Sequence, residues 1–223
     1  MHIEHFTFNS FQTSCYILWD NDGNCIIADP GCTPGAETEE LTEFISSKGL
    51  KPVCILLTHC HFDHIYGVEE LAGRYEIPVY AGAGEASTLE MTNPYMCKMF
   101  GFPLPETGFV SKAMKTVAEG DTIEAGSLRF EVMETPGHTT GGVCFLERTE
   151  RVLLSGDTLF AGSIGRTDHP GGNYDTLMES IFKKLLMLEG ETRVLPGHGP
   201  SSDISTERMT NPFLLPFNEP YEE

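Results

Sequence analysis

Apolar segments separated by turn residues predict a series of short strands along the chain. Near the N-terminus, residues 15–19 and 24–28 flank Asn21-Asp22-Gly23, a sequence typical of a β-hairpin. Residues 53–57 form a short continuous apolar run, as expected for a strand that is buried on both faces. Further strands are predicted at residues 78–80, 128–133, 143–146, 152–154 and 194–195.

Apolar residues recur at helical spacing in three other segments, which are residues 35–48, 65–74 and 175–188. Gly49 suits the C-terminal end of the first helix, because glycine readily adopts a positive φ. Residues 85–119 are rich in methionine and proline and have no clear period, so they form either a packed loop or a lid that moves over a pocket. Because strands and helices alternate, we expect a layered α/β fold in which residues 1–223 form a single domain.

The composition disfavours several classes of protein. The 223 residues include 14 Lys+Arg and 33 Asp+Glu, which gives a formal net charge of −19. This charge argues against nucleic acid and anionic membranes as partners, because both require an excess of Lys and Arg. No segment approaches the roughly 18 apolar residues of a membrane span, and the N-terminus lacks the features of a signal peptide. The seven cysteines form no C-x-x-C pair, so we expect reduced, buried thiols in a cytoplasmic protein.

The segment that follows the apolar run at residues 53–57 carries the strongest chemical signal. It reads Thr58-His59-Cys60-His61-Phe62-Asp63-His64, and imidazole and carboxylate groups are ligands for zinc, iron or manganese. If the strand continued, His59, His61 and Asp63 would share one face, whereas a turn at Phe62–His64 would direct His64 to a neighbouring site. A single histidine is more often a packed or surface residue, but three with an aspartate predict a metal site.

Three later loops repeat the arrangement of a predicted strand followed by a turn that contains His or Asp. They are residues 135–141 with His138, residues 155–158 with Asp157, and residues 196–199 with His198. In each loop a neighbouring glycine permits a sharp turn. Because ligand sites gather at the carboxyl ends of strands in α/β sheets, we expect the four loops to converge on one pocket.

These four motifs, in this order, resemble those of the metallo-β-lactamase superfamily, and more narrowly its glyoxalase II (hydroxyacylglutathione hydrolase-like) branch. The likeness extends from residue 58 to residue 199. It implies a four-layer αββα sandwich with a site for two divalent metal ions, with zinc expected first and iron or manganese as alternatives. Carried across by motif, His59, His61 and His138 would hold one ion, Asp63, His64 and His198 would hold the second, and Asp157 would bridge them.

The resemblance also implies a reaction, the hydrolysis of a small-molecule thioester. A hydroxide shared by the two metal ions would attack the carbonyl carbon, with Asp63 and Asp157 at the reacting centre. One ion would stabilise the charge that develops on the carbonyl oxygen. Asp29 would either orient a ligand histidine or act only as a turn residue before Pro30.

The chain departs from full-length glyoxalase II in ways that affect the substrate. Only 25 residues follow His198, so the chain resembles the shorter, single-domain glyoxalase II-like proteins, and we do not expect the C-terminal helical domain that supplies cations for glutathione. Arg166 is the candidate for binding a substrate carboxylate, with pairing to Asp168 as the alternative. His169 has no motif context and is interpreted as a loop residue.

Several other functions are alternatives to thioester hydrolysis. A persulfide dioxygenase would use a single iron bound by His59, His138 and Asp157, and lactones or other esters are alternative substrates for a hydrolase. A non-catalytic metal-binding module would need saturated coordination. A β-lactamase is disfavoured because those enzymes generally lack the aspartate found here as Asp157, and a ribonuclease is disfavoured by the charge of −19. A homo-oligomer is compatible with the sequence.

Overall fold

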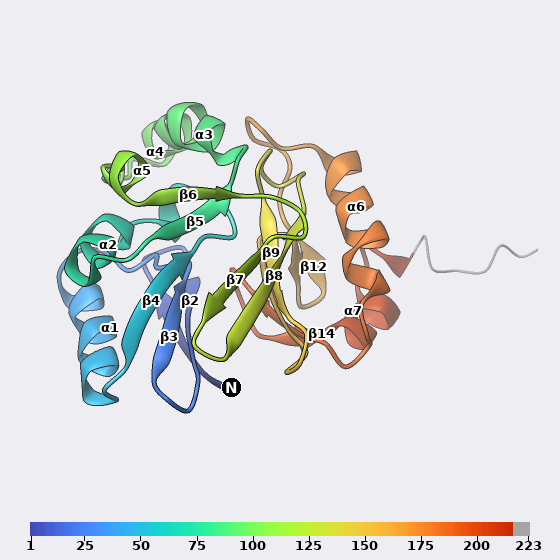
Figure 1. Ribbon diagram of the computed structural model, residues 1–223. Helices are drawn as coiled ribbons and strands as arrows, with labels where there is room; N and C mark the ends of the chain where they lie inside the picture. The colour runs from blue at the N-terminus through green and yellow to red at the C-terminus, as the bar shows by residue number, and fades with distance from the viewer. Residues whose placement is uncertain (216–223) are drawn as a thin grey trace, which may run out of the picture.

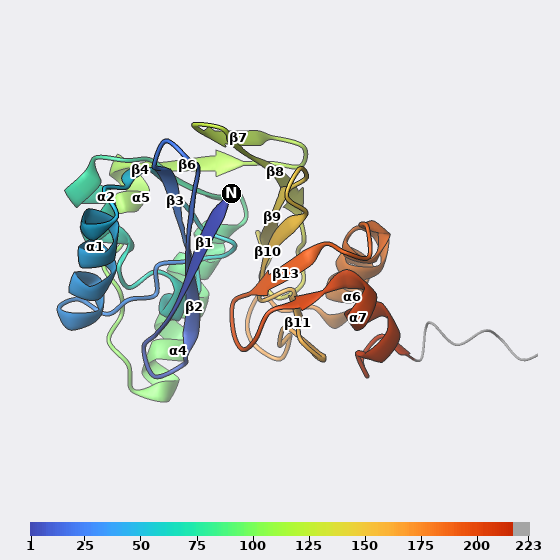
Figure 2. The same ribbon diagram turned by 90° about the horizontal axis from the view of Figure 1, so that it is seen from below.

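Two six-stranded sheets pack face to face in the computed structural model, which describes residues 1–215 (Figure 1). The first sheet has the strand order β1-β2-β3-β4-β5-β6, and the second has the order β14-β13-β10-β9-β8-β7. Figures 1 and 2 place helices α1 and α2 outside the first sheet and helices α6 and α7 outside the second. The four layers confirm the expected αββα sandwich.

The first half of the chain supplies the first sheet and its helices. Its elements are β1 His2–Phe8, β2 Thr13–Trp19, β3 Asn24–Ala28, α1 Ala36–Ser47, β4 Lys51–Leu56, α2 Val68–Tyr75, β5 Val79–Gly82, α3 Glu85–Ser87, α4 Asn93–Phe100, α5 Phe109–Lys112 and β6 Met114–Val117. The second half follows the same plan, with β7 Thr122–Ala125, β8 Leu128–Glu134, β9 Val143–Glu147, β10 Val152–Gly156, β11 Leu159–Phe160, β12 Ser163–Ile164, α6 Tyr174–Lys183, β13 Arg193–Pro196, β14 Ser202–Asp203 and α7 Ile204–Thr210.

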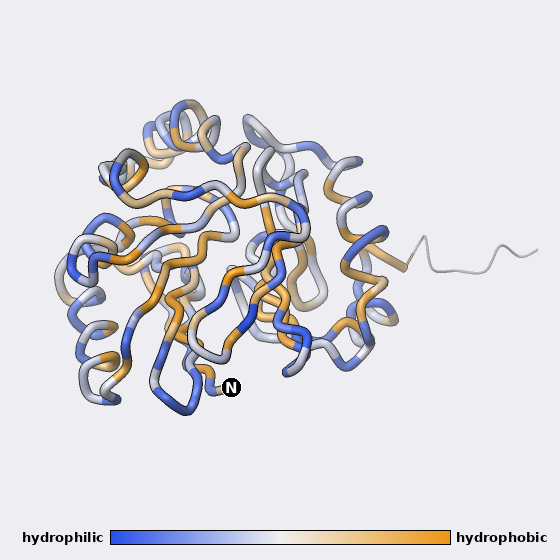
Figure 3. Tube along the Cα trace, viewed as in Figure 1, coloured by the Kyte–Doolittle hydropathy of each residue, from blue (hydrophilic) through white to orange (hydrophobic). Residues whose placement is uncertain are grey.

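The central strands are buried on both faces, and their side chains alternate between two hydrophobic layers. In β2, Cys15 and Ile17 pack in the cluster that includes α1 and α2, while Tyr16 and Leu18 pack between the two sheets. Successive side chains of a strand point to opposite faces, so a continuous apolar run serves both layers. In β9, Cys144 likewise contributes to a third cluster beneath α6 and α7. In Figure 3 the trace is hydrophobic along much of the central strands.

Most predicted elements are present, with shifted boundaries at the helices. The hairpin of β2 and β3 has Gly23 at φ 82°, and α1 is followed by Gly49 at φ 66°, as the sequence indicates. The second predicted helix is wrong at its start, because α2 begins at Val68 after a 3₁₀ turn at Phe62–His64. The helix predicted for residues 175–188 ends at Lys183, where Lys184 leaves helical geometry with φ −120° and a 3₁₀ turn follows.

Residues 85–119 are largely helical, which the sequence did not predict. Helix α3, a π turn at Thr88–Thr92 and helix α4 follow one another and are succeeded by α5 and strand β6. The sequence also missed β7, β14 and α7. All seven cysteines lie in the described part of the chain, and each is buried and unpaired, as expected. Within residues 1–215 there is no helix with the length and hydrophobicity to cross a bilayer.

Candidate metal centre

The four motif loops converge at one end of the two sheets, as the sequence predicts. Three groups of side chains there have potential ligand atoms within 4.8 Å of one another. They are His59, His61 and His138; His59, His64 and Asp157; and Asp63, His64 and His198. All seven residues to which the sequence assigns metal binding therefore belong to one continuous cluster.

The first loop turns sharply after the buried strand β4. That strand ends at Leu56, and residues Phe62–His64 form a single 3₁₀ turn. Of the two geometries open from the sequence, the turn is the one observed, so the strand does not continue through the motif. As a result His59 and His61 face His138, while Asp63 and His64 face His198.

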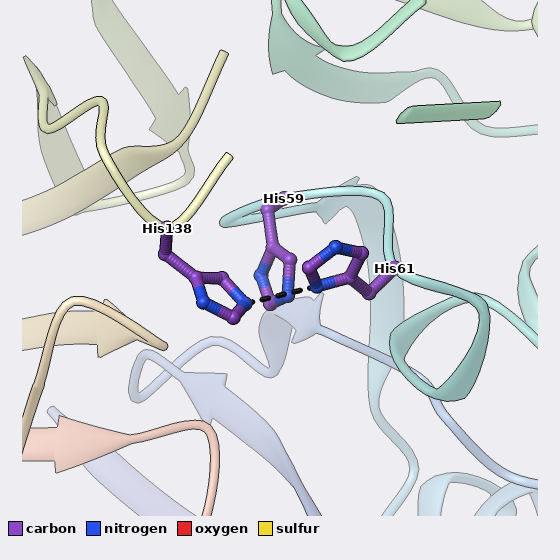
Figure 4. Close-up of side chains that lie close together, drawn as sticks. All are labelled: His59, His61 and His138. Carbon is purple, nitrogen blue, oxygen red and sulfur yellow. Dashed lines mark hydrogen bonds between the residues drawn. The ribbon is translucent and has the colours of Figure 1, made fainter. Parts of the chain in front are cut away.

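The first group consists of three histidines whose rings meet edge to face (Figure 4). The ring of His59 lies 4.7 Å from that of His61 and 4.8 Å from that of His138, measured between centroids. Nε2 of His138 lies 2.9 Å from Nδ1 of His61. All three residues are buried. Three imidazole nitrogens directed at one point form the donor set of many zinc and iron sites.

The second group combines two histidines with a carboxylate. Nε2 of His198 lies 3.4 Å from Oδ2 of Asp63, and Nε2 of His64 lies 3.6 Å from the same oxygen. The two Nε2 atoms are 3.4 Å apart. The hydroxyl of Thr13 donates a hydrogen bond of 2.8 Å to Oδ2 of Asp63 and fixes the orientation of the carboxylate.

Asp157 lies between the two groups. Its Oδ2 is 3.4 Å from Nε2 of His138 and 3.5 Å from Nε2 of His198, so one carboxylate oxygen reaches both groups. Close backbone packing makes this position possible: a Cβ atom added at Gly197 would lie 2.1 Å from Oδ1 of Asp157. Glycine is therefore required in the fourth motif for steric reasons, in addition to its turn propensity.

Hydrogen bonds on the outer side of the histidine rings hold the inner nitrogens toward the centre. Nδ1 of His138 donates to the carbonyl of Arg166 at 2.7 Å, and Nδ1 of His198 donates to the carbonyl of Phe11 at 3.1 Å. Nδ1 of His59 lies 3.2 Å from the hydroxyl of Thr58. A proton on each Nδ1 leaves the Nε2 lone pair free and directed inward, which is the form that binds a metal ion.

The electrostatic environment favours neutral imidazoles in the first group, whereas at His198 the carboxylates of Asp157 and Asp63 outweigh burial and raise the pKa to about 11. Burial, together with the neighbouring imidazoles, lowers the pKa of His59 and His61 well below the usual value. Burial would raise the pKa of Asp63, but His64 and His198 outweigh it and lower the pKa to about 2. The same balance lowers the pKa of Asp157. The first group is thus neutral and the carboxylates are ionised, as metal binding requires.

Orphaned polar atoms provide a test of whether the residues present fit a metal. Nε2 of His59, Nε2 of His61 and Oδ1 of Asp157 are buried and have no hydrogen-bond partner among the described residues. Buried polar atoms normally have partners, and leaving one unpaired costs about 1–3 kcal/mol. A cation would satisfy His59 and Asp157 directly. The donor set and these unpaired atoms therefore fit metal ions.

Asp29 lies directly behind the first motif. Its carboxylate accepts hydrogen bonds from the backbone N–H of Thr58 at 2.8 Å and from the Thr58 hydroxyl at 2.6 Å. Its Oδ2 also lies 3.3 Å from Nδ1 of His64. Asp29 adopts a positive φ of 46° at the turn. Asp29 therefore lies at a turn and beside a site histidine, which are the positions that its two expected roles require.

Arg166 adopts one of its two expected arrangements, whereas His169 differs from the expectation. The guanidinium of Arg166 makes two hydrogen bonds to Asp168, at 2.9 and 3.1 Å, which is the alternative that the sequence left open. His169 is wrongly interpreted as a plain loop residue, because its ring centroid lies 4.9 Å from that of His61 and 5.0 Å from that of His138. No spacing signal could have placed it there, since it comes from a loop more than 100 residues after His61.

The sequence also missed two buried residues that hold the peptide between His59 and His61. Oε2 of Glu85 accepts a hydrogen bond of 2.6 Å from the N–H of Cys60, and Nδ2 of Asn93 donates one of 2.8 Å to the Cys60 carbonyl. Oε1 of Glu85 also accepts from the hydroxyl of Thr139 at 2.5 Å. Glu85 therefore joins the first motif to the second.

A cleft of about 220 Å³ opens directly onto this cluster of candidate metal ligands. Polar residues of both groups form its floor, and aromatic residues form much of its wall. The twelve lining residues are Phe11, His61, Phe62, Asp63, Met96, Phe100, His138, Asp157, Phe160, Arg166, His169 and His198. A larger cavity of about 430 Å³ lies between α2, α5 and β6 and contains none of the motif residues.

Comparison with known proteins supports this assignment. A family model described as "Metallo-beta-lactamase superfamily" matches residues 9–198. The chain is 40% identical over 208 residues to the "Probable metallo-hydrolase YqgX" of Bacillus subtilis, covering 93% of this chain and 94% of that protein. It is 35% identical over 219 residues to the "Hydroxyacylglutathione hydrolase GloC" of Haemophilus influenzae, covering 96% of this chain and 98% of that protein.

Two solved structures share the whole fold. One is the crystal structure of the BLEG-1 B3 metallo-beta-lactamase, with a TM-score of 0.87, 36% identity, and coverage of 96% of this chain and 99% of that chain. The other is TTHA1623 in a di-iron-bound form, with a TM-score of 0.81, 35% identity, and coverage of 95% and 100%. With the motifs, the sandwich and the histidine–aspartate cluster in agreement, the chain belongs to the metallo-β-lactamase superfamily.

Proposed function

We propose that the protein is a binuclear metal hydrolase that cleaves small thioesters of the hydroxyacyl type. The observation that carries the proposal is the pair of ligand groups joined by Asp157 at the floor of an open cleft. His59, His61 and His138 would hold one ion, Asp63, His64 and His198 the other, and Asp157 would contact both. The likeness to a hydroxyacylglutathione hydrolase supports a thioester as the substrate.

Two metal ions at this position would supply an activated water and a Lewis acid for the carbonyl oxygen. The chain's own residues prepare the site for that chemistry. The carbonyls of Arg166 and Phe11 hold protons on Nδ1 of His138 and His198, and Thr13 orients Asp63. A thiolate is a stable leaving group and needs no proton donor in the cleft.

Zinc is the metal that we propose first, because imidazole nitrogens and carboxylate oxygens are the usual ligands of catalytic zinc sites. Iron is the second candidate, and the di-iron form of TTHA1623 supports it for a relative with 35% identity. Purified protein should contain two metal ions per chain by elemental analysis and should hydrolyse a 2-hydroxyacyl thioester, as detected by the free thiol. A single iron per chain, with oxygen uptake on addition of a persulfide, would instead identify a dioxygenase.

The variant Asp157→Ala tests the assignment of the site. It should lose most of its metal and nearly all hydrolysis, while circular dichroism shows a folded chain. Asp168→Ala is the matched control, because Asp168 is exposed and pairs only with Arg166 among the contacts described for its side chain. The control should retain both metal ions. Retention of hydrolysis by Asp157→Ala would contradict the role of Asp157 between the ions.

Hydrolysis of β-lactams is a second candidate function. The specific observation in its favour is the similarity to BLEG-1, whose structure superimposes with a TM-score of 0.87. Turnover of a chromogenic cephalosporin by the same metal-loaded preparation would distinguish the two reactions. We expect the specificity constant for the thioester to exceed that for the cephalosporin, and the opposite order would make the lactam the better assignment.

A further inference from the structure

The cleft above the candidate metal ligands has an apolar wall that the proposed chemistry does not require. Five of its twelve lining residues are Phe11, Phe62, Met96, Phe100 and Phe160. These residues come from four separate segments of the chain, yet they surround the same opening. The apolar side chains of this wall offer no metal ligands, so their chemistry bears on the part of the substrate that lies beyond the reacting carbonyl.

Phe11 is the centre of this wall. Its ring contacts Phe62 at 5.1 Å, Phe100 at 6.2 Å and Phe102 at 4.8 Å between centroids, all in edge-to-face geometry. The backbone carbonyl of Phe11 also accepts the hydrogen bond from His198. The same residue thus shapes the apolar wall and orients a ligand of the proposed second metal ion, which keeps the wall at a fixed position relative to the reacting centre.

The outer part of the wall is anchored to the metal-binding loops. Met96 and Phe100 lie on α4, whose first residue, Asn93, donates to the carbonyl of Cys60. Thr92, just before α4, donates a hydrogen bond of 3.0 Å to the carbonyl of Pro170 on the opposite side of the cleft. A preformed surface loses little conformational entropy when a ligand binds. Phe100 remains 42% exposed, so apolar surface is available for a ligand to cover.

The charges around the cleft disfavour an anionic group at this wall. Arg166 is the one Arg or Lys among the twelve lining residues, and both hydrogen bonds of its guanidinium go to Asp168. A carboxylate on the substrate would have to share Arg166 with Asp168 and approach a chain with a formal net charge of −19. An uncharged arm avoids both the competition with Asp168 and the repulsion by the negative chain. It would also be stabilised by covering the apolar surface of Phe100.

We propose that the site selects thioesters that carry one uncharged, apolar arm, with Phe11, Met96 and Phe100 as the residues that determine this specificity. The inference rests on the proposed thioester hydrolysis. Burial of about 55 Å² of apolar surface corresponds to about a tenfold gain in affinity, at about 25 cal/mol per Å². The apolar arm belongs either to the thiol or to the acyl group, and the experiment below distinguishes the two.

The test uses two series of thioesters with the metal-loaded protein. In the first series a constant lactoyl group is joined to benzyl mercaptan or to mercaptoacetate. In the second, a constant mercaptoethanol is joined to a phenylacetyl or a succinyl group. We expect kcat/KM to be at least about tenfold higher for the neutral apolar member of one series, and that series identifies the arm. Calorimetric titration with the matching non-hydrolysable thioethers should give the same order of affinity.

Variants of α4 connect the preference to the wall. Phe100→Ser should lower kcat/KM for the preferred apolar substrate by about tenfold, while Phe100→Arg should shift the preference toward the carboxylate-bearing member. Met99→Ser is the matched control, because Met99 is the adjacent residue, is 55% exposed and does not line the cleft. The control should retain the parental preference.

The two proposals fail in different ways. Preferential binding of the apolar thioethers without cleavage of any thioester would support the apolar site and overturn the proposed hydrolysis. Cleavage with equal or higher kcat/KM for the carboxylate-bearing members of both series would support the hydrolysis and overturn the apolar specificity. A preference that Phe100→Ser and Phe100→Arg leave unchanged would also overturn it, because the wall would then not be its source.

Discussion

Replacement of Glu85 should weaken metal binding although no atom of Glu85 belongs to the ligand groups. The residue is fully buried, and its carboxylate joins the N–H of Cys60 to the hydroxyl of Thr139. Cys60 lies between His59 and His61, and Thr139 follows His138. A single side chain therefore sets the distance between the two loops that carry the three histidines of the first group.

The magnitude follows from the hydrogen bonds that are lost. Glu85→Ala would leave the buried N–H of Cys60 unpaired, at about 1–3 kcal/mol, and would lose a charge-assisted bond to Thr139 and create a cavity. We expect a total loss of about 3–5 kcal/mol in the free energy of unfolding. Glu85→Gln keeps the volume and one acceptor oxygen, and should cost about 1–2 kcal/mol. Residues that orient metal ligands typically change metal affinity by about 10–100-fold.

The assay separates stability from metal binding. Urea unfolding in the presence of a chelator reports the stability of the metal-free chain, and competition with a chromophoric chelator reports metal affinity. Glu207→Gln is the matched control, because Glu207 is also a buried carboxylate and accepts hydrogen bonds from Gly162 N–H and Asn211 Nδ2 at 2.8 Å. The reasoning is refuted if Glu85→Gln binds metal as tightly as Glu207→Gln.

Three further outcomes are expected. Phe130→Ala, in the layer between the sheets, should lower the free energy of unfolding by about 3–5 kcal/mol in urea titrations. Hydrogen bonds from Asn24 and Ser127 hold the pKa of Asp20 well below its usual value. The resulting stabilisation of the folded state is present above the unfolded pKa of about 4 and is lost as the pH falls. The difference in urea midpoint between the parent and Asp20→Asn should therefore shrink on acidification. Zinc at about 100 times its dissociation constant should stabilise the metal-free chain by about 2.7 kcal/mol in thermal unfolding, and Asp157→Ala should not respond.

The sequence predicts the site well where it depends on local order along the chain. His59, His138, Asp157 and His198 each follow a strand next to a glycine or a turn, and strand ends in layered α/β folds meet at one edge. Their convergence is therefore readable from position alone. The sequence does not decide whether the strand continues or turns after His61, because the same residues fit both geometries until the packing of Phe62 is known.

What the sequence could not predict depends on contacts between distant segments. Glu85 and Asn93 act through hydrogen bonds to Cys60. Because the segment around them has no clear hydrophobic period, the sequence does not distinguish the buried carboxylate of Glu85 from that of a surface glutamate. His169 reaches the cluster through a loop whose path is set by tertiary packing. Helix α7 had a readable start in Asp203, whose side chain accepts from the N–H of Thr206. Its seven residues have too little apolar periodicity to reveal it.

The ligand residues come from both halves of the chain, so the complete site forms only after both halves have folded. His59, His61, Asp63 and His64 come from the first sheet, while His138, Asp157 and His198 come from the second. Each group draws on both halves, and the second is complete only when β13 has paired with β10. A chain that lacks β13 lacks His198 and therefore has an incomplete second group. If that group binds an ion, the ion would add a second link between the two halves only after β13 has formed.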